Sequence, residues 1–451
     1  MERLTTLDAG FLEAEDADQH ISLAVGGVSV LEGPMPDFEE LAADVLEKAA
    51  AVPRMRQVLR THLLDMQPPE WVDVPNVDLS HHIHHVALPQ PGSDQELFRL
   101  TADIMERRLD RERPLWECWM IEGLAGGHWA MLLKIHHCIA DGITIMHMLS
   151  QLTDGGAGDS FATDIRAAKE GSGQKNSPKI GLNPLNWARS GWRLAAAATT
   201  SAELAFGGAL RIAGGILSPA DGSPLIGSVT TMRRYSAARV SLQDVAKVRD
   251  TFGVTLNDVA LAAVTASYRA ALTRRGKSAR RNSLRTLVPV SVRSNDAMGI
   301  TDNRVSVMLP FLPVDREDPV DRLMTVHQRL NVAKSSGERE AGSAFIAAVN
   351  VIPFPLTAWT VRALTRLPQR GVVALATNVP GPRHRLRIMD REVVRMMPIP
   401  PIALGLRTGV AIVSYADELT FGITADYDAA PDVDELAAGI EHGVAELVAL
   451  L

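Results

Sequence analysis

The sequence predicts an α+β protein of two halves that a long crossover connects. The length of 451 residues exceeds what one hydrophobic core usually holds, so two domains are expected. Strand-like and helix-like segments alternate, and a stretch rich in Gly, Ser, Asp and Lys at 155–184 predicts a linker. We therefore place an N-terminal domain at 1–184, a helical crossover and linker at 185–230, and a C-terminal domain at 231–451.

Composition narrows the class of protein. Hydrophobic residues make up 46% of the chain and charged residues 22%, which is typical of a soluble globular protein. The net charge of −7 argues against a general nucleic-acid binder. The two cysteines, Cys118 and Cys138, cannot form a disulfide framework or a zinc cage, so we expect a reducing cytoplasm. Residues Met1–Asp8 lack the features of a signal peptide, and no stretch of about 18 residues is uniformly apolar, so we expect no membrane span.

Four segments of the N-terminal half have clear patterns. They are, in order, a β-rich strand, an amphipathic helix, a buried strand and a second helix: Ile21–Leu31, Phe38–Ala51, Trp129–Ile135 and Ile143–Leu152. The turn Glu32–Pro34 ends the first strand, and Pro53 stops the first helix. The run His136–Gly142 therefore lies at a strand-to-helix turn, where side chains are held rigidly yet can face a cleft.

The crossover and the C-terminal half continue the alternation. Residues 185–217 are predicted to be helical, and a turn-rich break follows at 218–228. The later segments are two helices, a strand, two paired strands and a last helix: Leu242–Phe252, Leu256–Thr273, Leu284–Val292, Gly409–Ser414 with Leu419–Ala425, and a helix from about Val433. In the last helix Leu436, Ile440 and Val444 share one face, which predicts packing against a core.

The run His136-His137-Cys138-Ile139-Ala140-Asp141-Gly142 has the groups that proton transfer needs. An unperturbed imidazole has a pKa of about 6.5 and can accept a proton from a hydroxyl near neutral pH. Such base catalysis typically contributes a factor of about 10²–10⁴ in rate. Transfer of an acyl group from a thioester to an alcohol needs little more than a base, an oriented carbonyl and an oxyanion donor. His137 is thus a candidate general base for ester formation.

The same run also has a purely structural interpretation, in which a His pair ends a strand and Asp141-Gly142 is an ordinary turn. Asp141 could hold this turn by pairing with an arginine or by accepting backbone N–H bonds, and so fix the imidazole. Gly142 permits a φ angle or a close approach that other residues resist. A His-x-x-x-Asp spacing recurs by chance, so the wider sequence has to decide between the two interpretations.

Several further motifs occur in a fixed order along the chain. They are Leu7–Phe11, the Pro114-Leu115-Trp116-Glu117 box about twenty residues before the His pair, Asn257-Asp258, Val288–Arg293, Asn303–Ser306 and Asn378–Pro382. Each motif is weak alone. Together they resemble the bacterial wax ester synthase/diacylglycerol acyltransferase family, and the resemblance runs nearly from end to end.

The resemblance implies two chloramphenicol-acetyltransferase-like domains of mixed sheets flanked by helices, as in peptide-synthetase condensation domains. It implies an active-site tunnel at their interface with His137 at its centre as the general base. His136, Asp141 and Gly142 would shape the site, and no covalent acyl-enzyme would form. No G-x-S-x-G nucleophile motif occurs in the sequence, which agrees with this expectation. Acyl-CoA would be a co-substrate, with no other cofactor and no metal.

The resemblance also implies the acceptor and the setting. Diacylglycerol would be esterified to triacylglycerol, and long-chain alcohols are a further possible acceptor that would give wax esters. We expect a cytoplasmic protein that contacts the inner membrane or lipid inclusions peripherally, and no nucleic-acid partner. One alternative is a condensation-type acyltransferase with a carrier-protein-bound donor. Another is a non-catalytic lipid-body protein, which the apolar segments 194–210 and 345–361 would suit.

The Asn257-Asp258 pair has two interpretations. Thr255-x-x-Asp258 fits a capping box that opens the helix from Leu256, and capping is the better interpretation of Asp258 from sequence alone. The family resemblance makes both residues candidates for lining the site. Asn257 in particular could help to hold the acceptor or the oxyanion.

Three more residues are assigned to the site or its support. Glu117 and Trp116 would border the site according to the resemblance, but from sequence alone a core position is the better interpretation of the tryptophan. Arg293 could be an exposed residue at a strand end. It is also the candidate partner of Asp141, because a fixed charge pair would brace the turn.

Two polar clusters invite other functions. His81, His82, His84 and His85 suggest a metal site, but successive side chains of a strand alternate between faces, so we predict a structural strand and no metal. The basic run Arg274–Arg281 is expected to be a solvated loop. Contact with coenzyme A phosphates or anionic lipid headgroups is its functional alternative.

Overall fold

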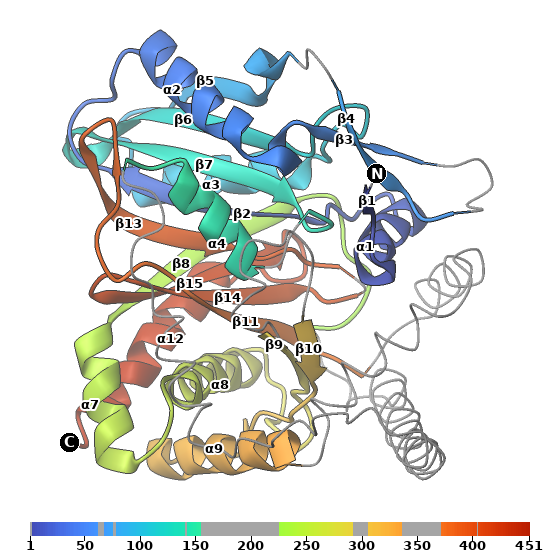
Figure 1. The fold of residues 1–451 in the computed structure, drawn as a ribbon. Coiled ribbons are helices and arrows are strands. Elements are labelled where there is room, and N and C mark those ends of the chain that lie inside the picture. The colour runs from blue at the N-terminus through green and yellow to red at the C-terminus, as the bar shows by residue number, and fades with distance from the viewer. Residues whose placement is uncertain are drawn as a thin grey trace, which may run out of the picture.

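The fold is built on two six-stranded sheets and one small three-stranded sheet (Figure 1). The computed structural model describes eight ranges of the chain: 2–61, 67–74, 78–139, 142–154, 225–291, 305–335, 371–403 and 405–451. Most of the predicted crossover at 185–230 lies outside these ranges, as do both apolar segments at 194–210 and 345–361.

The first sheet belongs mainly to the N-terminal half. Its strands, in spatial order, are β12 (Arg387–Ile388), β13 (Arg391–Ile399), β2 (Ala24–Leu31), β7 (His128–His136), β6 (Trp116–Leu124) and β5 (Ile83–Ala87). The helices of this half are α1 (Thr6–Ala17), α2 (Phe38–Ala51), α3 (Asp94–Glu106) and α4 (Gly142–Gln151). The small sheet consists of β1 (Glu2–Arg3), β4 (Glu70–Asp73) and β3 (Gln57–Arg60), and the 3₁₀ turns are Pro53–Met55, Leu79–His82 and Ala125–Gly127.

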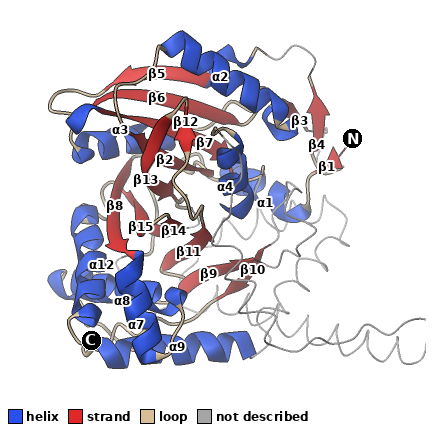
Figure 2. Cartoon of the chain, turned by 60° about the vertical axis from the view of Figure 1, so that its left-hand side comes forward, coloured by secondary structure: helices blue, strands red, loops and turns tan. Residues whose placement is uncertain are grey.

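The second sheet belongs wholly to the C-terminal half. Its strands, in spatial order, are β10 (Val305–Met308), β9 (Thr286–Ser291), β11 (Ala374–Pro380), β14 (Thr408–Tyr415), β15 (Glu418–Asp426) and β8 (Arg233–Ser241). Four helices, α7 (Leu242–Phe252), α8 (Leu256–Arg274), α9 (Pro319–Ser335) and α12 (Val433–Val448), lie together on the face away from the first sheet (Figures 1 and 2). Strand β11 runs parallel to both β9 and β14, whereas the other pairs are antiparallel. The predicted α+β class with mixed sheets flanked by helices is confirmed.

Strands β12 and β13 leave the C-terminal half and join the first sheet. β13 pairs antiparallel with β2 and also packs against β14 and β15 of the second sheet. At this contact the Tyr235 hydroxyl donates to the Pro398 carbonyl (3.0 Å), and a Cβ on Gly422 would lie 1.6 Å from the same oxygen. The segment 231–451 therefore contributes to both sheets, and β13 holds the two halves together.

Most elements that the sequence predicts are present, with ends that differ by a few residues. The helices predicted at Phe38–Ala51 and Leu242–Phe252 coincide with α2 and α7. The strand predicted from Ile21 begins only at Ala24, because the Leu23 N–H donates to the Glu15 carboxylate (3.0 Å) rather than to a neighbouring strand.

Each half has its own apolar core. Strand β7 is apolar from Trp129 to Leu133 and buried along nearly its whole length, as expected of a strand covered on both faces. In the second half, apolar side chains of α8 and α12 pack against the sheet, and the predicted face of Leu436, Ile440 and Val444 is buried there. None of the helices described in the structure is long and apolar enough to cross a membrane.

Candidate active site

His137 lies in the turn between the end of β7 and the start of α4, as the sequence predicts. Its backbone N–H donates to the Leu23 carbonyl (3.0 Å) in the segment that leads into β2. Its ring stacks on Phe11 of α1, with 4.3 Å between ring centroids and an interplanar angle of 24°. The side chain is only partly buried, so the imidazole is oriented by its neighbours yet remains within reach of a substrate.

His136 is buried and has a neighbour at each ring nitrogen. The Cys138 N–H donates to His136 Nδ1 (3.1 Å), which requires the ring proton to be on Nε2 in this arrangement. His136 Nε2 lies 3.5 Å from Glu15 Oε2. Because one ring nitrogen accepts the Cys138 N–H and the other faces Glu15, His136 has an architectural position.

Glu15, in the last turn of α1, was not identified from the sequence. Its carboxylate accepts the Leu23 N–H at Oε1 (3.0 Å) and pairs through Oε2 with Arg111 (2.7 Å) as well as facing His136. Burial raises the pKa of Glu15, but hydrogen bonds from His136, Arg111 and the Leu23 N–H outweigh it and lower the pKa to about 2. An ionised carboxylate thus braces Leu23, whose carbonyl in turn holds His137. The only sequence signal is the helical spacing of Phe11 and Glu15, which places both on one face of α1.

Glu117 supports the same strand from β6. In the register of the first sheet it lies opposite Lys134 of β7, and Glu117 Oε2 is 3.5 Å from Lys134 Nζ. Lys134 is fully buried and donates to the Ile104 carbonyl in the last turn of α3 (2.9 Å). Burial lowers the pKa of Lys134, and Glu117 opposes that effect. The carboxylate of the Pro114–Glu117 box therefore compensates a buried charge two residues before His136.

Trp116 occupies a core position, the interpretation that the sequence alone favours. Its side chain has no solvent exposure, its Nε1 donates to the Met55 carbonyl (2.9 Å), and its ring stacks on His82. A tryptophan whose polar atom is satisfied inside a core contributes mainly packing.

Asp258 has the capping role that the sequence alone favours. It is buried and forms the predicted capping box with Thr255 at the start of α8. The same carboxylate is 2.7 Å from Nδ1 of His327 on α9. His327 Nε2 is 2.9 Å from the Asn331 amide nitrogen, which places the ring proton on Nδ1, facing Asp258.

Asn257 meets Asn378 of β11, whose amide donates to the Asn257 side-chain oxygen (3.3 Å). The next residue of β11, Val379, points to the opposite face of the sheet, where α4 packs. A Cβ on Gly142 would lie 2.6 Å from Val379 Cγ2, so close approach, and not an unusual φ angle, explains this glycine. Two consecutive residues of β11 therefore connect the Asn257 end of α8 with the start of α4.

The remaining predicted residues fall into two groups. Asp141 and Arg293 lie outside the described residues, so their pairing stays a prediction, as does the tunnel. Three histidines of the N-terminal cluster stack on aromatic rings: His82 on Trp116, His84 on Trp119 and His85 on Phe38. The strand begins only at Ile83, so His81 and His82 lie in a 3₁₀ turn before it. Among the described residues no group of three or more His, Cys, Asp or Glu could hold a metal ion.

The basic run Arg274–Arg281 lies at the far end of α8 from Asn257. Its first two arginines pair with carboxylates of the α12 region, Arg274 with Glu435 (2.7 Å) and Arg275 with Asp432. These ion pairs attach α8 to the start of α12.

Family comparisons cover nearly the whole chain. Residues 4–260 match the wax ester synthase/diacylglycerol acyltransferase catalytic domain, and residues 301–448 match the C-terminal domain of the same family. A Mycobacterium tuberculosis protein named probable diacylglycerol O-acyltransferase is 52% identical, and the match covers 100% of this chain and 96% of that protein. The O-acyltransferase WSD of Acinetobacter baylyi is 27% identical over 98% of this chain and 96% of its own length.

Solved structures show the same fold. The wax ester synthase/diacylglycerol acyltransferase of Marinobacter aquaeolei VT8 superposes with a TM-score of 0.65 at 24% identity, covering 99% of this chain and 98% of that one. The starter condensation domain of rhizomide synthetase, solved as a mutant with C8-CoA and Leu-SNAC, has a TM-score of 0.60 at 13% identity and covers 100% of this chain and 94% of that one. The condensation-type fold that the sequence motifs imply is confirmed.

Proposed function

Since the chain belongs to the wax ester synthase/diacylglycerol acyltransferase family and is an acyltransferase, we propose that it esterifies diacylglycerol to triacylglycerol with long-chain acyl-CoA as donor. The observation that carries the proposal is the position of His137, a partly exposed imidazole held by Leu23 and Phe11 in the turn after β7. Long-chain alcohols, which would give wax esters, are the second acceptor class that the family name suggests.

In the proposed reaction His137 accepts the proton of the acceptor hydroxyl as its oxygen attacks the thioester carbonyl. The tetrahedral intermediate then collapses, the carbon–sulfur bond breaks, and the coenzyme A thiolate takes up the proton from His137. The products are an ester and free coenzyme A, and no acyl-enzyme forms. This sequence needs no cofactor beyond the acyl-CoA co-substrate, and a positioned base typically contributes a factor of about 10²–10⁴.

The acceptor is insoluble, so the proposal includes peripheral contact with a membrane or a lipid inclusion surface. Residues 194–210 and 345–361 are the apolar segments that would suit such contact. Binding of the purified protein to diacylglycerol-containing vesicles, measured by co-sedimentation, tests this part separately from catalysis.

The central test is replacement of His137 by glutamine, which keeps a polar side chain but removes the base. Triacylglycerol formation from palmitoyl-CoA and diacylglycerol should fall by about 10²–10⁴. His442→Ala is the matched control, because this histidine is 75% exposed on α12 and belongs to the other half of the molecule. Unchanged activity in His137→Gln, with a normal melting curve, would refute the catalytic assignment.

A second candidate function follows from the likeness to condensation domains, which is a likeness of fold alone. The donor would then be an acyl group bound to a carrier protein. Assays with palmitoyl-CoA and with palmitoylated acyl carrier protein, each with diacylglycerol, separate the two candidates. Transfer only from the carrier protein would favour the second.

A further inference from the structure

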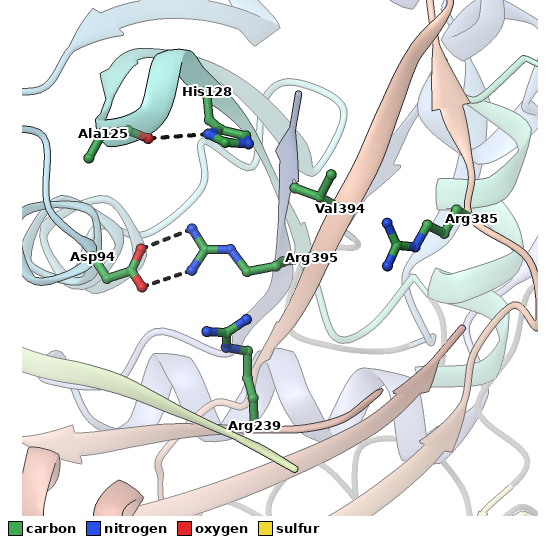
Figure 3. Close-up of a pocket in the computed structure, with 7 residues that line it drawn as sticks. All are labelled: Asp94, Ala125, His128, Arg239, Arg385, Val394 and Arg395. Carbon is green, nitrogen blue, oxygen red and sulfur yellow. Dashed lines mark hydrogen bonds and ion pairs between the residues drawn. The ribbon is translucent and has the colours of Figure 1, made fainter. Parts of the chain in front are cut away.

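A basic pocket lies between the two halves, away from His137. Its volume is about 560 Å³, and Asp94, Ala125 and His128 line it from the N-terminal half. Arg239 of β8, Arg385 before β12, and Val394 and Arg395 of β13 line it from the C-terminal half. Figure 3 shows the Arg239 and Arg385 side chains extending toward Arg395 from two sides.

The lining has a surplus of positive charge. Among the residues that line the pocket Asp94 is the one acid beside three guanidinium groups, and its carboxylate binds Arg395 through two hydrogen bonds of 2.7 and 2.9 Å. This pair joins α3 to β13 and fixes Arg395 at the wall of the pocket.

Arg239 and Arg385 contact carboxylates that do not line the pocket. Arg239 lies 3.5 Å from Glu418, and Arg385 lies 2.8 Å from Glu392 and 3.5 Å from Asp417. A guanidinium has five N–H donors in a planar fork, so one or two such contacts leave donors for a further anion. Both side chains are about two-fifths exposed, at 41% and 43%, so a ligand from solvent can reach them. Planar donors of this kind favour phosphate groups.

Strand register gives the distance from this pocket to His137. Arg395 of β13 lies opposite Val30 of β2, which lies opposite Ala130 of β7. Ala130 precedes His136 by six residues on β7, so the pocket is about 20 Å from the candidate base along the strand. This distance is too long for direct action on the reacting atoms. It is comparable to the length of an extended pantetheine arm.

We propose that this pocket binds the phosphate groups of the acyl-CoA donor, with the pantetheine arm extending along the interface of the halves to His137. The inference rests on the proposed function, because it assumes acyl-CoA as the donor. The basic run Arg274–Arg281 is the less suitable of the two candidate phosphate sites. Arg274 and Arg275 already pair with carboxylates at the far end of α8.

The test measures binding of free coenzyme A and of pantetheine, which lacks all the phosphates, by titration calorimetry. The Arg239→Ala and Arg385→Ala variants should each raise the Kd for coenzyme A roughly tenfold, the loss of about one charge-assisted hydrogen bond. Binding of pantetheine should not change. Arg274→Ala is the matched control, an arginine of similar exposure (41%) in the rival basic run, and should bind coenzyme A as the wild type does.

Three results would overturn the proposal: unchanged coenzyme A affinity in both variants, an equal loss of pantetheine affinity, or a loss only in Arg274→Ala. A loss of binding to phosphatidylglycerol vesicles with coenzyme A affinity unchanged would also overturn it and indicate a lipid headgroup site. The proposed function is tested apart from this, by wild-type turnover of palmitoyl-CoA. The pocket assignment stands if the variants weaken coenzyme A binding while the wild type fails to acylate diacylglycerol.

Discussion

The imidazole of His137 is oriented by groups that do not themselves react. The Leu23 carbonyl fixes its backbone, Phe11 stacks on its ring, and Glu15 fixes Leu23 through a buried hydrogen bond. A base held in this way loses little entropy on reaching the reactive geometry, which is the main requirement of positioned catalysis. Glu15 is thus the residue whose loss should disturb the turn most without touching a substrate.

The ionisation of Glu15 makes a pH-dependent contribution to stability. Its pKa is lowered to about 2 in the folded protein from an ordinary value of 4.5, so the folded state favours the carboxylate. The stabilisation is fully present above pH 4.5 and is lost as the pH falls from there toward 2. We expect Glu15→Gln to be less stable than the wild type by on the order of 3 kcal/mol at pH 7, with a difference that shrinks on acidification. Urea unfolding at pH 7, 5, 4 and 3 measures it.

A matched control for Glu15→Gln is Asp16→Asn, since Asp16 also pairs with Arg111 but is 48% exposed. That variant should change stability by less than about 1 kcal/mol at every pH. A difference between Glu15→Gln and the wild type that stays constant from pH 7 to pH 3 would contradict an ionised Glu15.

The Glu117–Lys134 pair gives a second prediction at this scale. Removal of one partner leaves the other charge uncompensated, so Glu117→Gln should leave the buried Lys134 ammonium without its counter-charge and cost roughly 3 kcal/mol. Lys134→Met removes the buried charge itself and should cost less than Glu117→Gln. The double variant should recover part of the loss, which a double-mutant cycle of unfolding free energies measures. Additive losses would show that the two residues do not interact.

The sequence predicted His137 and the turn around it because these depend on a local pattern. It could not predict Glu15 or Lys134, because each acts through a partner that is distant along the chain: Arg111 and His136 for Glu15, and Ile104 for Lys134. The motif that contains Trp116 left its position open between site and core for a related reason. A motif shows that a residue type matters, but not whether it faces a cavity or a core.

At the scale of elements, α4 and β11 meet at Gly142. A Cβ there would lie 2.6 Å from Val379 Cγ2, and a β-branched side chain has little freedom to move aside. Gly142→Ala should therefore displace the turn that holds His137, lower kcat by about tenfold or more, and cost about 1–3 kcal/mol in stability.

Val379→Ala provides the matched test of this contact. In the Gly142→Ala background it removes the opposing methyl groups, so the double variant should recover most of the lost kcat. Val379→Ala alone should change kcat little. If the double variant is as slow as Gly142→Ala, the effect of the alanine is on the backbone of the turn and not on the contact with β11.

Helix and strand positions were predictable wherever a local signal defines them. Thr255 and Asp258 mark the start of α8 as a capping box, and that prediction is confirmed. The contact of Asp258 with His327 was not predictable, since it joins α8 to α9 across 69 residues of sequence. The same limit applies to Asn257, whose partner Asn378 lies 121 residues away.

At the scale of the whole molecule, the two halves followed from length and alternation and the mixed sheets from the family resemblance, but the exchange of β13 followed from neither. Its residues show no regular alternation of buried and exposed positions, and nothing in their pattern selects β2 of the other half as a partner. Pairing between distant strands is decided by the packing of the complete fold. The predicted boundaries therefore describe the order of segments along the chain, while the first sheet draws on both ends of it.

The exchanged strand should make the two halves unfold as one unit. Gly422 of β15 lies against the Pro398 carbonyl of β13, where a Cβ would approach to 1.6 Å, so Gly422→Ala must push the two sheets apart. Because the Cβ is bonded directly to the Gly422 backbone and the oxygen belongs to the Pro398 backbone, neither can move aside cheaply, and we expect a loss above about 3 kcal/mol. Gly10→Ala is the control, since a Cβ on Gly10 meets nothing within 4 Å and alanine favours a helix.

Hydrogen exchange shows whether this loss reaches both halves. If β13 couples them, amide exchange in Gly422→Ala should accelerate in β2 and β7 as well as in β14 and β15, because breaking the contact frees a strand of the first sheet. Faster exchange confined to β14 and β15 would mean that the first sheet keeps β13 without the second, and the halves would then be separate folding units. The coupled outcome also bears on the site, since His137 follows a strand of one sheet and Val379 belongs to the other.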